Sequence, residues 1–322
     1  MGFRVLNDSQ SFTSVLPARE EQIPFPGCYS LRVPISHRRA ALALLGAALL
    51  FSTGGAGIKS LDFSGWQIAS LRSGIAALTL LVLVPAARRG WGWRAGLVGL
   101  AYAITGICFV LANRLTSSAS AIFIQSASPL YVLLLAPLLL REPVSRRDIL
   151  FMVPVGLGLA LFFVGDERPV ATAPDPLAGN LIAALSAVTF AFAVIGLRWL
   201  GRKQGGDGAT PATAAVMGNV IACVVTLPMA LPLGSHAGAD WAILIYLGVV
   251  QIGVAYLLIS RAMVRLTALE ASVLLLLEPV LNPVWSWLVH GEVPGPLAMA
   301  GGALVLGATI ARAGLTETLS PQ

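Results

Sequence analysis

Residues 128–144 read SPLYVLLLAPLLLREPV, and residues 278–294, 150 positions later, read EPVLNPVWSWLVHGEVP. The aligned identities are Pro129 with Pro279, Leu138 with Leu288, and Glu142 with Glu292. Each stretch is an apolar helix with an internal proline, then a glutamate 13 residues on, then a proline-containing turn. A Gly- and Ala-rich apolar helix follows each one, and small residues favour close backbone packing. This order indicates an internal repeat of hydrophobic helices.

The composition is that of a membrane protein. The 322 residues are 57% hydrophobic and only 11% charged, with a mean hydropathy of +0.82. Soluble domains carry about 25% charged residues, so this chain has too little charge to cover a soluble surface of its size. This excludes a soluble enzyme, a disordered protein and a nucleic-acid binder.

Ten segments are long and apolar enough to cross a bilayer, which takes roughly 18 residues or more. Eight of them lack charge: 40–58, 95–113, 115–140, 149–165, 176–197, 208–239, 241–260 and 293–311. Two contain one internal charge, Arg72 within 66–87 and Glu278 within 269–290, which also has Glu270 at its entry. The short alternating segments of a β-barrel are absent, so helices are the remaining solution. We expect an all-α membrane protein with ten transmembrane helices.

The basic residues predict the orientation of these helices. Positive charge collects on the cytoplasmic side of short loops. Seventeen of the 21 Lys and Arg residues fall on one side, and Lys59, Arg114 and Arg168 fall on the other. The termini are therefore expected in the cytoplasm, in a multi-pass protein of the plasma membrane, and the net charge of +6 is a topology signal. Because five helices is an odd number, the second repeat is inverted relative to the first.

The expected organisation has five parts. They are a disordered cytoplasmic tail at 1–36, a first repeat at 37–165, an extracytoplasmic linker at 166–176, a second repeat at 177–314 and a cytoplasmic tail at 315–322. The first part has no signal-peptide pattern. The three cysteines and three histidines lack disulfide or zinc spacing, so we expect neither a metal nor a cofactor.

A resemblance to a known family rests on several pieces in a fixed order. They are Lys59 after a Gly-rich first helix, SLRSGIAAL around Arg72, SASAIFIQSASPLYVLLLAPLLLREPVS, GVAYLLISRAMVRLTALEASVLLLLEPV, and GEVP. Across residues 38–313 the chain resembles the EamA branch of the drug/metabolite transporter (DMT) superfamily, with two EamA repeats. The resemblance implies transport of small metabolites, often amino acids or drug-like amphiphiles, without ATP hydrolysis. Arg141 departs from the pattern, where a small residue usually precedes the glutamate, and Pro283 is an additional proline.

The ninth predicted helix carries the main candidate site. Glu278, Asn282 and Trp285 lie on one helix face, at i, i+4 and i+7. Acidic groups inside a membrane are rare and functional by default. Glu278 is therefore a candidate for sensing an amphipathic substrate or for coupling to a proton. The structural alternative is a neutral acid that donates to a carbonyl freed by Pro279 or Pro283, with Trp285 filling core volume.

Other polar groups inside the predicted spans extend this candidate site. Arg72 has three possible roles: it binds a substrate carboxylate or phosphate, pairs with Glu278, or extends its charged end to the outer interface. The further candidates are Tyr102, Thr105, Gln125, Ser128, Gln251 and Tyr256, with a polar stripe at Asn219, Cys223 and Thr226. Each of them also suits hydrogen bonding between helices.

The sequence therefore predicts a secondary transporter rather than an enzyme. It would export amino acids or related amphiphilic metabolites by alternating access, through a site between the inverted repeats. Its partners would be a small-molecule substrate, the lipid bilayer and a candidate coupling proton; substrate identity, direction, coupling ion and oligomeric state stay open. One alternative is a lipid-linked or nucleotide-sugar carrier of the same superfamily, although only Arg72 and Lys59 would supply cations for a nucleotide. The other alternative is a polytopic membrane enzyme, which would need clustered acids, histidines or a metal site.

Overall fold

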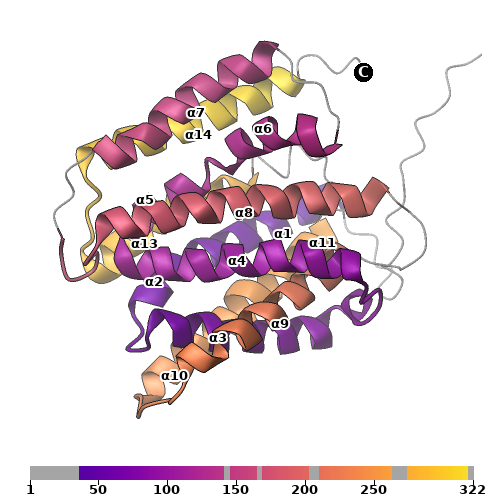
Figure 1. Ribbon diagram of the computed structural model, residues 1–322, viewed down its shortest axis with the longest axis vertical. Coiled ribbons are helices and arrows are strands. Elements are labelled where there is room, and N and C mark those ends of the chain that lie inside the picture. The colour runs from indigo at the N-terminus through magenta and orange to yellow at the C-terminus, as the bar shows by residue number, and fades with distance from the viewer. Residues whose placement is uncertain (1–35, 141–145, 165–168, 203–209, 263–273, 318–322) are drawn as a thin grey trace, which may run out of the picture.

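The computed structural model describes residues 36–140, 146–164, 169–202, 210–262 and 274–317. Within these ranges the chain is all-helical and forms no strand, apart from an isolated bridge between Val170 and Ala173. The helices lie side by side in a bundle (Figure 1). In chain order they are α1 (His37–Ser52), α2 (Gly54–Lys59), α3 (Gly65–Leu83), η1 (Pro85–Arg88), α4 (Trp93–Leu115), α5 (Ser118–Gln125), α6 (Ser128–Leu140), α7 (Arg146–Val164), α8 (Pro176–Arg202), α9 (Pro211–Ala230), α10 (Gly238–Tyr246), η2 (Leu247–Val254), α11 (Ala255–Ala262), α13 (Leu277–His290) and α14 (Pro296–Glu317).

Seven helical segments of the described chain are long and apolar enough to cross a membrane. They are His37–Lys59, Gly65–Leu83, Trp93–Leu115, Ser118–Leu135, Pro176–Leu197, Pro211–Ala230 and Gly238–Ile259. Two shorter apolar helices are Leu150–Val164 and Pro296–Ala308. Large apolar side chains such as Leu138, Leu150 and Val164 cover the outside of the bundle, as a lipid-facing surface requires. The prediction of a multi-pass membrane protein is confirmed.

The aligned prolines interrupt their helices in the same way. The fourth predicted span consists of α5 and α6, with a turn at residues 126–127 just before Pro129. In the ninth, Leu276 forms a turn just before α13 and Pro279. Proline lacks a backbone donor and clashes with the preceding turn, which accounts for both interruptions. The first span is also broken, at Thr53 between α1 and α2.

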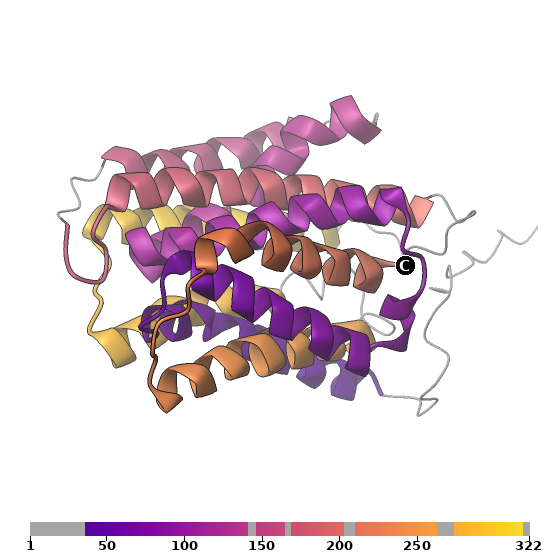
Figure 2. The same ribbon diagram turned by 60° about the horizontal axis from the view of Figure 1, so that its bottom comes forward.

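The two halves of the chain interlock. α3 packs along α9, α4 packs on α8 and α9, α7 packs on α14, and α1 packs on α11 and α13. Figure 1 shows α7 beside α14, and the turned view of Figure 2 shows α3 between α9 and the run from α10 to α11. Exchanging each helix for its counterpart in the other half converts the α4–α8 contact into α11–α1, and α6–α8 into the contacts of α13 with α1 and α2. The contact pattern is thus largely unchanged when the halves are exchanged.

Glycines allow two pairs of helices from opposite halves to approach at backbone distance. A Cβ on Gly158 of α7 would lie 2.7 Å from the carbonyl oxygen of Gly301 in α14. Between α4 and α9, a Cβ on Gly99 would lie 2.9 Å from the backbone nitrogen of Gly218. Small residues at such positions let membrane helices gain van der Waals contact. The two Gly- and Ala-rich helices, α7 and α14, therefore pack closely at Gly158. A Cβ on Gly156 would meet open space.

The predicted tails lie mostly outside the described residues. Of the segment 1–36 only Ser36 is described, and its side chain accepts a hydrogen bond from Arg39 N at the start of α1. At the other end, α14 continues to Glu317, three residues into the segment expected as a tail. Arg141 and Glu142 also lie outside the described residues.

Candidate functional site

Arg72 lies inside the bundle, at a small cavity formed by helices of both halves. Its side chain extends from α3 and the residue is only 6% exposed. The cavity measures about 30 Å³, and its other polar lining residues are Ser73, Tyr102 and Asn219. Two guanidinium nitrogens, Nε and Nη1, have no hydrogen-bond partner in the described structure. The charged end of Arg72 therefore lies within the protein rather than at the outer interface.

Tyr102 lines the same cavity as this arginine. Its ring packs edge-to-face against Tyr256 of α11, with the ring centroids 6.1 Å apart. Its hydroxyl interacts with the side chains of Tyr256 and Asn219, and the charges of both Arg72 and Glu278 act on it. Arg72 and Glu278 form no salt bridge within the described residues. Three predicted candidates, Arg72, Tyr256 and Glu278, thus act on Tyr102, and the pairing of Arg72 with Glu278 that was one of its possible roles is not formed among the described residues.

Buried polar groups without partners gather around the break between α1 and α2. Asn282 is 0% exposed, and neither atom of its side-chain amide has a partner in the described structure. The same holds for Oγ of Ser118, Oγ of Ser286 and Oε1 of Gln251. A Cβ on Gly55 would lie 2.6 Å from Asn282 Oδ1 and 3.0 Å from Ser118 Oγ, so both groups face the same stretch of backbone. Unpaired buried polar atoms are costly, so water or a polar ligand would gain hydrogen bonds here.

Side chains of the second half hold the end of α1 next to this cluster. Trp285 Nε1 donates a hydrogen bond of 2.9 Å to Ser52 Oγ. Gln251 Nε2 donates to the carbonyl oxygen of Phe51 at 3.4 Å, and the ring of Tyr256 packs edge-to-face on Phe51. The first helix is therefore fixed by α13, η2 and α11 just before it breaks.

Two of the remaining predicted candidates, Thr105 and Gln125, bond to α8. Thr105 Oγ1 donates to Thr189 Oγ1 at 2.9 Å, and Gln125 Nε2 donates to Ser186 Oγ at 2.8 Å. Ser128 is buried at 7% exposure, at the start of α6. The contacts of Thr105 and Gln125 are those of the structural alternative, in which polar groups join helices to one another.

A buried ion pair at one end of the bundle was not predicted from the sequence. Lys59, at the end of α2, pairs with Glu292, just after α13, and the side chains are 4% and 5% exposed. The Nζ–Oε1 distance is 3.0 Å. Lys59 Nζ also donates to the carbonyl oxygens of Thr116, at 2.8 Å, and Thr172. Glu292 Oε2 accepts from the backbone N–H of Ser118 at 3.1 Å, so this one pair ties four segments together.

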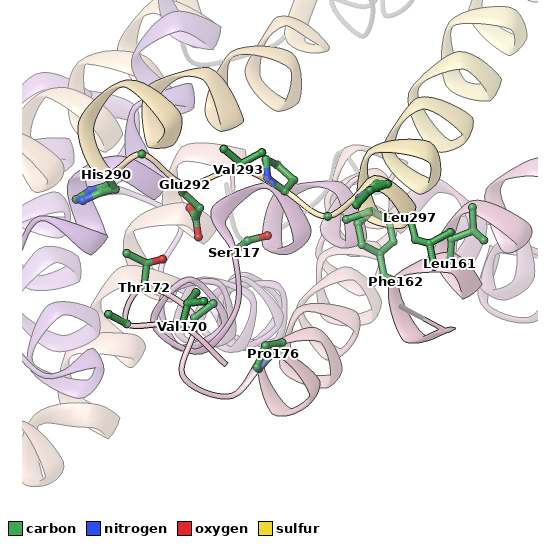
Figure 3. A pocket seen from close by; sticks show the side chains of 17 residues that line it. Ser117, Leu161, Phe162, Val170, Thr172, Pro176, His290, Glu292, Val293 and Leu297 are labelled. Atoms are coloured by element: carbon green, nitrogen blue, oxygen red, sulfur yellow. The ribbon is translucent and has the colours of Figure 1, made fainter. Parts of the chain in front are cut away.

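A pocket of about 600 Å³ borders the ion pair (Figure 3). Its walls include Ser117, Phe162, the turn at residues 170–173 and the segment from His290 to Ala298. Figure 3 shows the Glu292 carboxylate pointing toward Ser117 and Thr172. His290 Nε2 lies 3.0 Å from the carbonyl oxygen of Ala56, which holds the end of α13 against α2. The sequence signal for Glu292 was the recurrence of a glutamate after each proline-containing helix. Its pairing with Lys59 could not be predicted from that repeat.

Similarity to known proteins gives a context for this geometry. The model of the EamA-like transporter family matches residues 38–164 and 177–311. A relative in Pseudomonas aeruginosa strain UCBPP-PA14, the pseudopaline exporter CntI, is 28% identical over 279 residues, covering 84% of this chain and 94% of the relative. The protein of that name in strain PAO1 is 28% identical over 285 residues, with the same coverage of each chain. One solved crystal structure has a similar fold, with a TM-score of 0.59, 19% identity, and coverage of 89% of this chain and 100% of that chain.

Proposed function

Because the chain belongs to the EamA-like transporter family, we propose that it is a secondary transporter that exports a small metabolite across the plasma membrane by alternating access. The observation that carries this proposal is the group of polar side chains around Tyr102, to which helices of both halves contribute. Secondary transporters bind their substrates at the interface of their inverted repeats. Outward transport is supported by the two relatives that are pseudopaline exporters.

The proposed topology is ten spans in two inverted sets of five, with both termini in the cytoplasm. The seven long apolar helices, together with α7, α13 and α14, supply ten segments. The matching interruptions before Pro129 and Pro279 support a repeat, as does the contact pattern between the halves. The distribution of Lys and Arg supports the orientation.

In this orientation the Lys59–Glu292 pair lies at the extracytoplasmic end of the bundle. It joins the end of α2, the connection between α4 and α5, the turn at Thr172 and the turn after α13. We assign this pair as the contact that closes the outer side of the transport path. In alternating access the outer side must open to release an exported substrate, so the pair must break in each cycle.

The proposed substrate site has two parts. The first part is formed by Arg72, Tyr102, Tyr256 and Glu278. The second part lies near the break between α1 and α2, and the helices that line it carry Asn282, Gln251, Trp285 and Ser128. Thr105 and Gln125 fix α4 and α5 to α8, and we assign them to the wall of the site. Glu278 is the proposed proton carrier, since it is a half-buried acid in the first turn of α13.

Transport assays with reconstituted protein test this proposal. The full chain would be placed in proteoliposomes, and counterflow of each of the common amino acids, radiolabelled, would be measured with and without a pH gradient. Saturable counterflow above that of empty liposomes supports transport, and acceleration by the gradient supports proton coupling. Counterflow equal to that of empty liposomes for every compound would contradict amino acids as the substrate class.

A further inference from the structure

Arg72 is a cation without a neutralising anion in the interior of the bundle. It is 6% exposed, it forms no salt bridge in the described part of the chain, and its Nε and Nη1 have no hydrogen-bond partner there. The other buried cation among the described ion pairs, Lys59, is matched by Glu292. An unpaired charge in such surroundings is costly, and it persists where function uses it. The missing partner of Arg72 is an anion.

The cavity at Arg72 offers neutral hydrogen-bonding groups in addition to the charge. Ser73, Tyr102 and Asn219 line it with Arg72. Gly106 also lines it, and a Cβ there would meet nothing within 4 Å. Its volume of about 30 Å³ is close to that of one water molecule and far below the roughly 300 Å³ of a metabolite pocket. In this conformation the cavity has room for an anchoring group only.

We propose that Arg72 binds the carboxylate group of the exported molecule, so that the substrate class is small monocarboxylates, zwitterions included. This inference rests on the transport function proposed above and names its substrate class. A guanidinium group matches the planar carboxylate with two parallel hydrogen bonds. With Glu278 protonated, one cation balances one carboxylate, whereas a dianionic phosphate would leave a net negative charge in a low-dielectric interior.

Anion binding is tested first without any assumption about transport. Thermal unfolding of the purified full chain would be measured in sodium formate, the smallest carboxylate, against equal concentrations of sodium chloride and of neutral formamide. At formate concentrations several times the dissociation constant, we expect an increase in Tm of about 2–4 °C over the chloride sample, and none with formamide. No difference between formate and chloride would overturn the proposal, and a chloride-specific shift would assign an inorganic counter-ion instead.

Variants locate the binding. Arg72→Gln should lose the formate shift, whereas Arg88→Gln should keep it, because Arg88 is exposed and its side chain donates to the carbonyl oxygens of Leu81 and Val82. Arg72→Lys keeps the charge and Tyr102→Phe removes one hydroxyl, so both serve if Arg72→Gln fails to fold. We expect both to show a smaller shift than the wild type. An undiminished shift in Arg72→Gln and Arg72→Lys would contradict binding at this residue.

Transport separates this inference from the proposed function. In proteoliposomes, each transported amino acid would be competed with its unlabelled free acid and with its carboxamide. Competition by the acid alone, lost in Arg72→Lys, supports a carboxylate site. Equal competition by acid and amide would overturn the inference while transport itself stands. A formate shift that depends on Arg72, without transport of any amino acid, would support the anion site and contradict amino acids as the exported class.

Discussion

Lys59 and Glu292 form a buried ion pair, with Nζ and Oε1 3.0 Å apart, between the end of α2 and the turn after α13. The two residues are 233 positions apart, one in each half of the chain. Lys59 also donates to backbone carbonyl oxygens of Thr116 and Thr172, and Glu292 accepts from the backbone N–H of Ser118. This single contact therefore ties four segments together at one end of the bundle, and in the proposed transport cycle it would have to break for that end to open.

Lys59→Met should loosen this end of the protein. The substitution leaves the Glu292 carboxylate buried without its cation, a change that typically costs about 3–5 kcal/mol. We expect a lower Tm and faster labelling of a cysteine introduced at Ser117, in the adjoining pocket, by a membrane-impermeant maleimide. The experiment uses a chain in which the three native cysteines are replaced.

The double variant Lys59→Met, Glu292→Leu is the control for this prediction. Replacing both partners by apolar groups removes the unpaired charge, so a large part of the lost stability should return. Labelling at Ser117→Cys should stay fast in the double variant, because the ion pair is still missing. A labelling rate in Lys59→Met equal to that of the parent chain would argue against closure by this contact.

Gly158→Val should separate α7 from α14. A Cβ at Gly158 would lie 2.7 Å from the carbonyl oxygen of Gly301, so the two backbones have to move apart. Overpacking of this kind costs roughly 1–3 kcal/mol, which should appear as a lower Tm in detergent. Gly156→Val is the matched control, since a Cβ at Gly156 meets nothing within 4 Å. If both variants unfold at the same temperature, the close contact between α7 and α14 is not present in the folded protein.

The fold class and the interruptions of the helices could be predicted from the sequence. Hydropathy and length identify apolar helices, because a chain in hydrocarbon has few other ways to satisfy its backbone. The breaks before Pro129 and Pro279 follow from the local chemistry of proline, as predicted from the repeat. Both features depend on residues that are neighbours in sequence.

The partners of the polar residues could not be predicted in the same way. Arg72 lies near the start of its helix, where an extended side chain reaches the interface as easily as the interior, and only the packing of α9 and η2 around α3 decides between them. Thr105 and Gln125 turn to α8 rather than to a cavity, which hydropathy alone does not show. The ion pair between Lys59 and Glu292 depends on how the two halves interlock.

Asn282→Leu should strongly reduce transport without lowering stability. Neither side-chain amide atom of Asn282 has a hydrogen-bond partner in the described structure, so an apolar side chain of similar size breaks no protein contact. We expect an unchanged or higher Tm and at least about a tenfold lower flux, the effect of losing roughly 1.4 kcal/mol of substrate interaction. Val284→Leu, on the exposed face of the same helix, should change neither. A marked fall in Tm with normal flux would instead make Asn282 a structural residue.

Glu278→Gln should separate transport from the pH gradient. If Glu278 carries the coupling proton, it must bind a proton on one side of the membrane and release it on the other in each cycle. Glutamine keeps the size and polarity of the protonated acid but cannot release a proton. We therefore expect saturable counterflow to remain, while the acceleration by an outside-acidic gradient disappears. Counterflow would be measured in proteoliposomes at equal pH and with a gradient, with Asp62→Asn, at an exposed carboxyl group, as a second variant that should retain the gradient response. An unchanged gradient response in Glu278→Gln would leave the acid with a structural role beside Pro279.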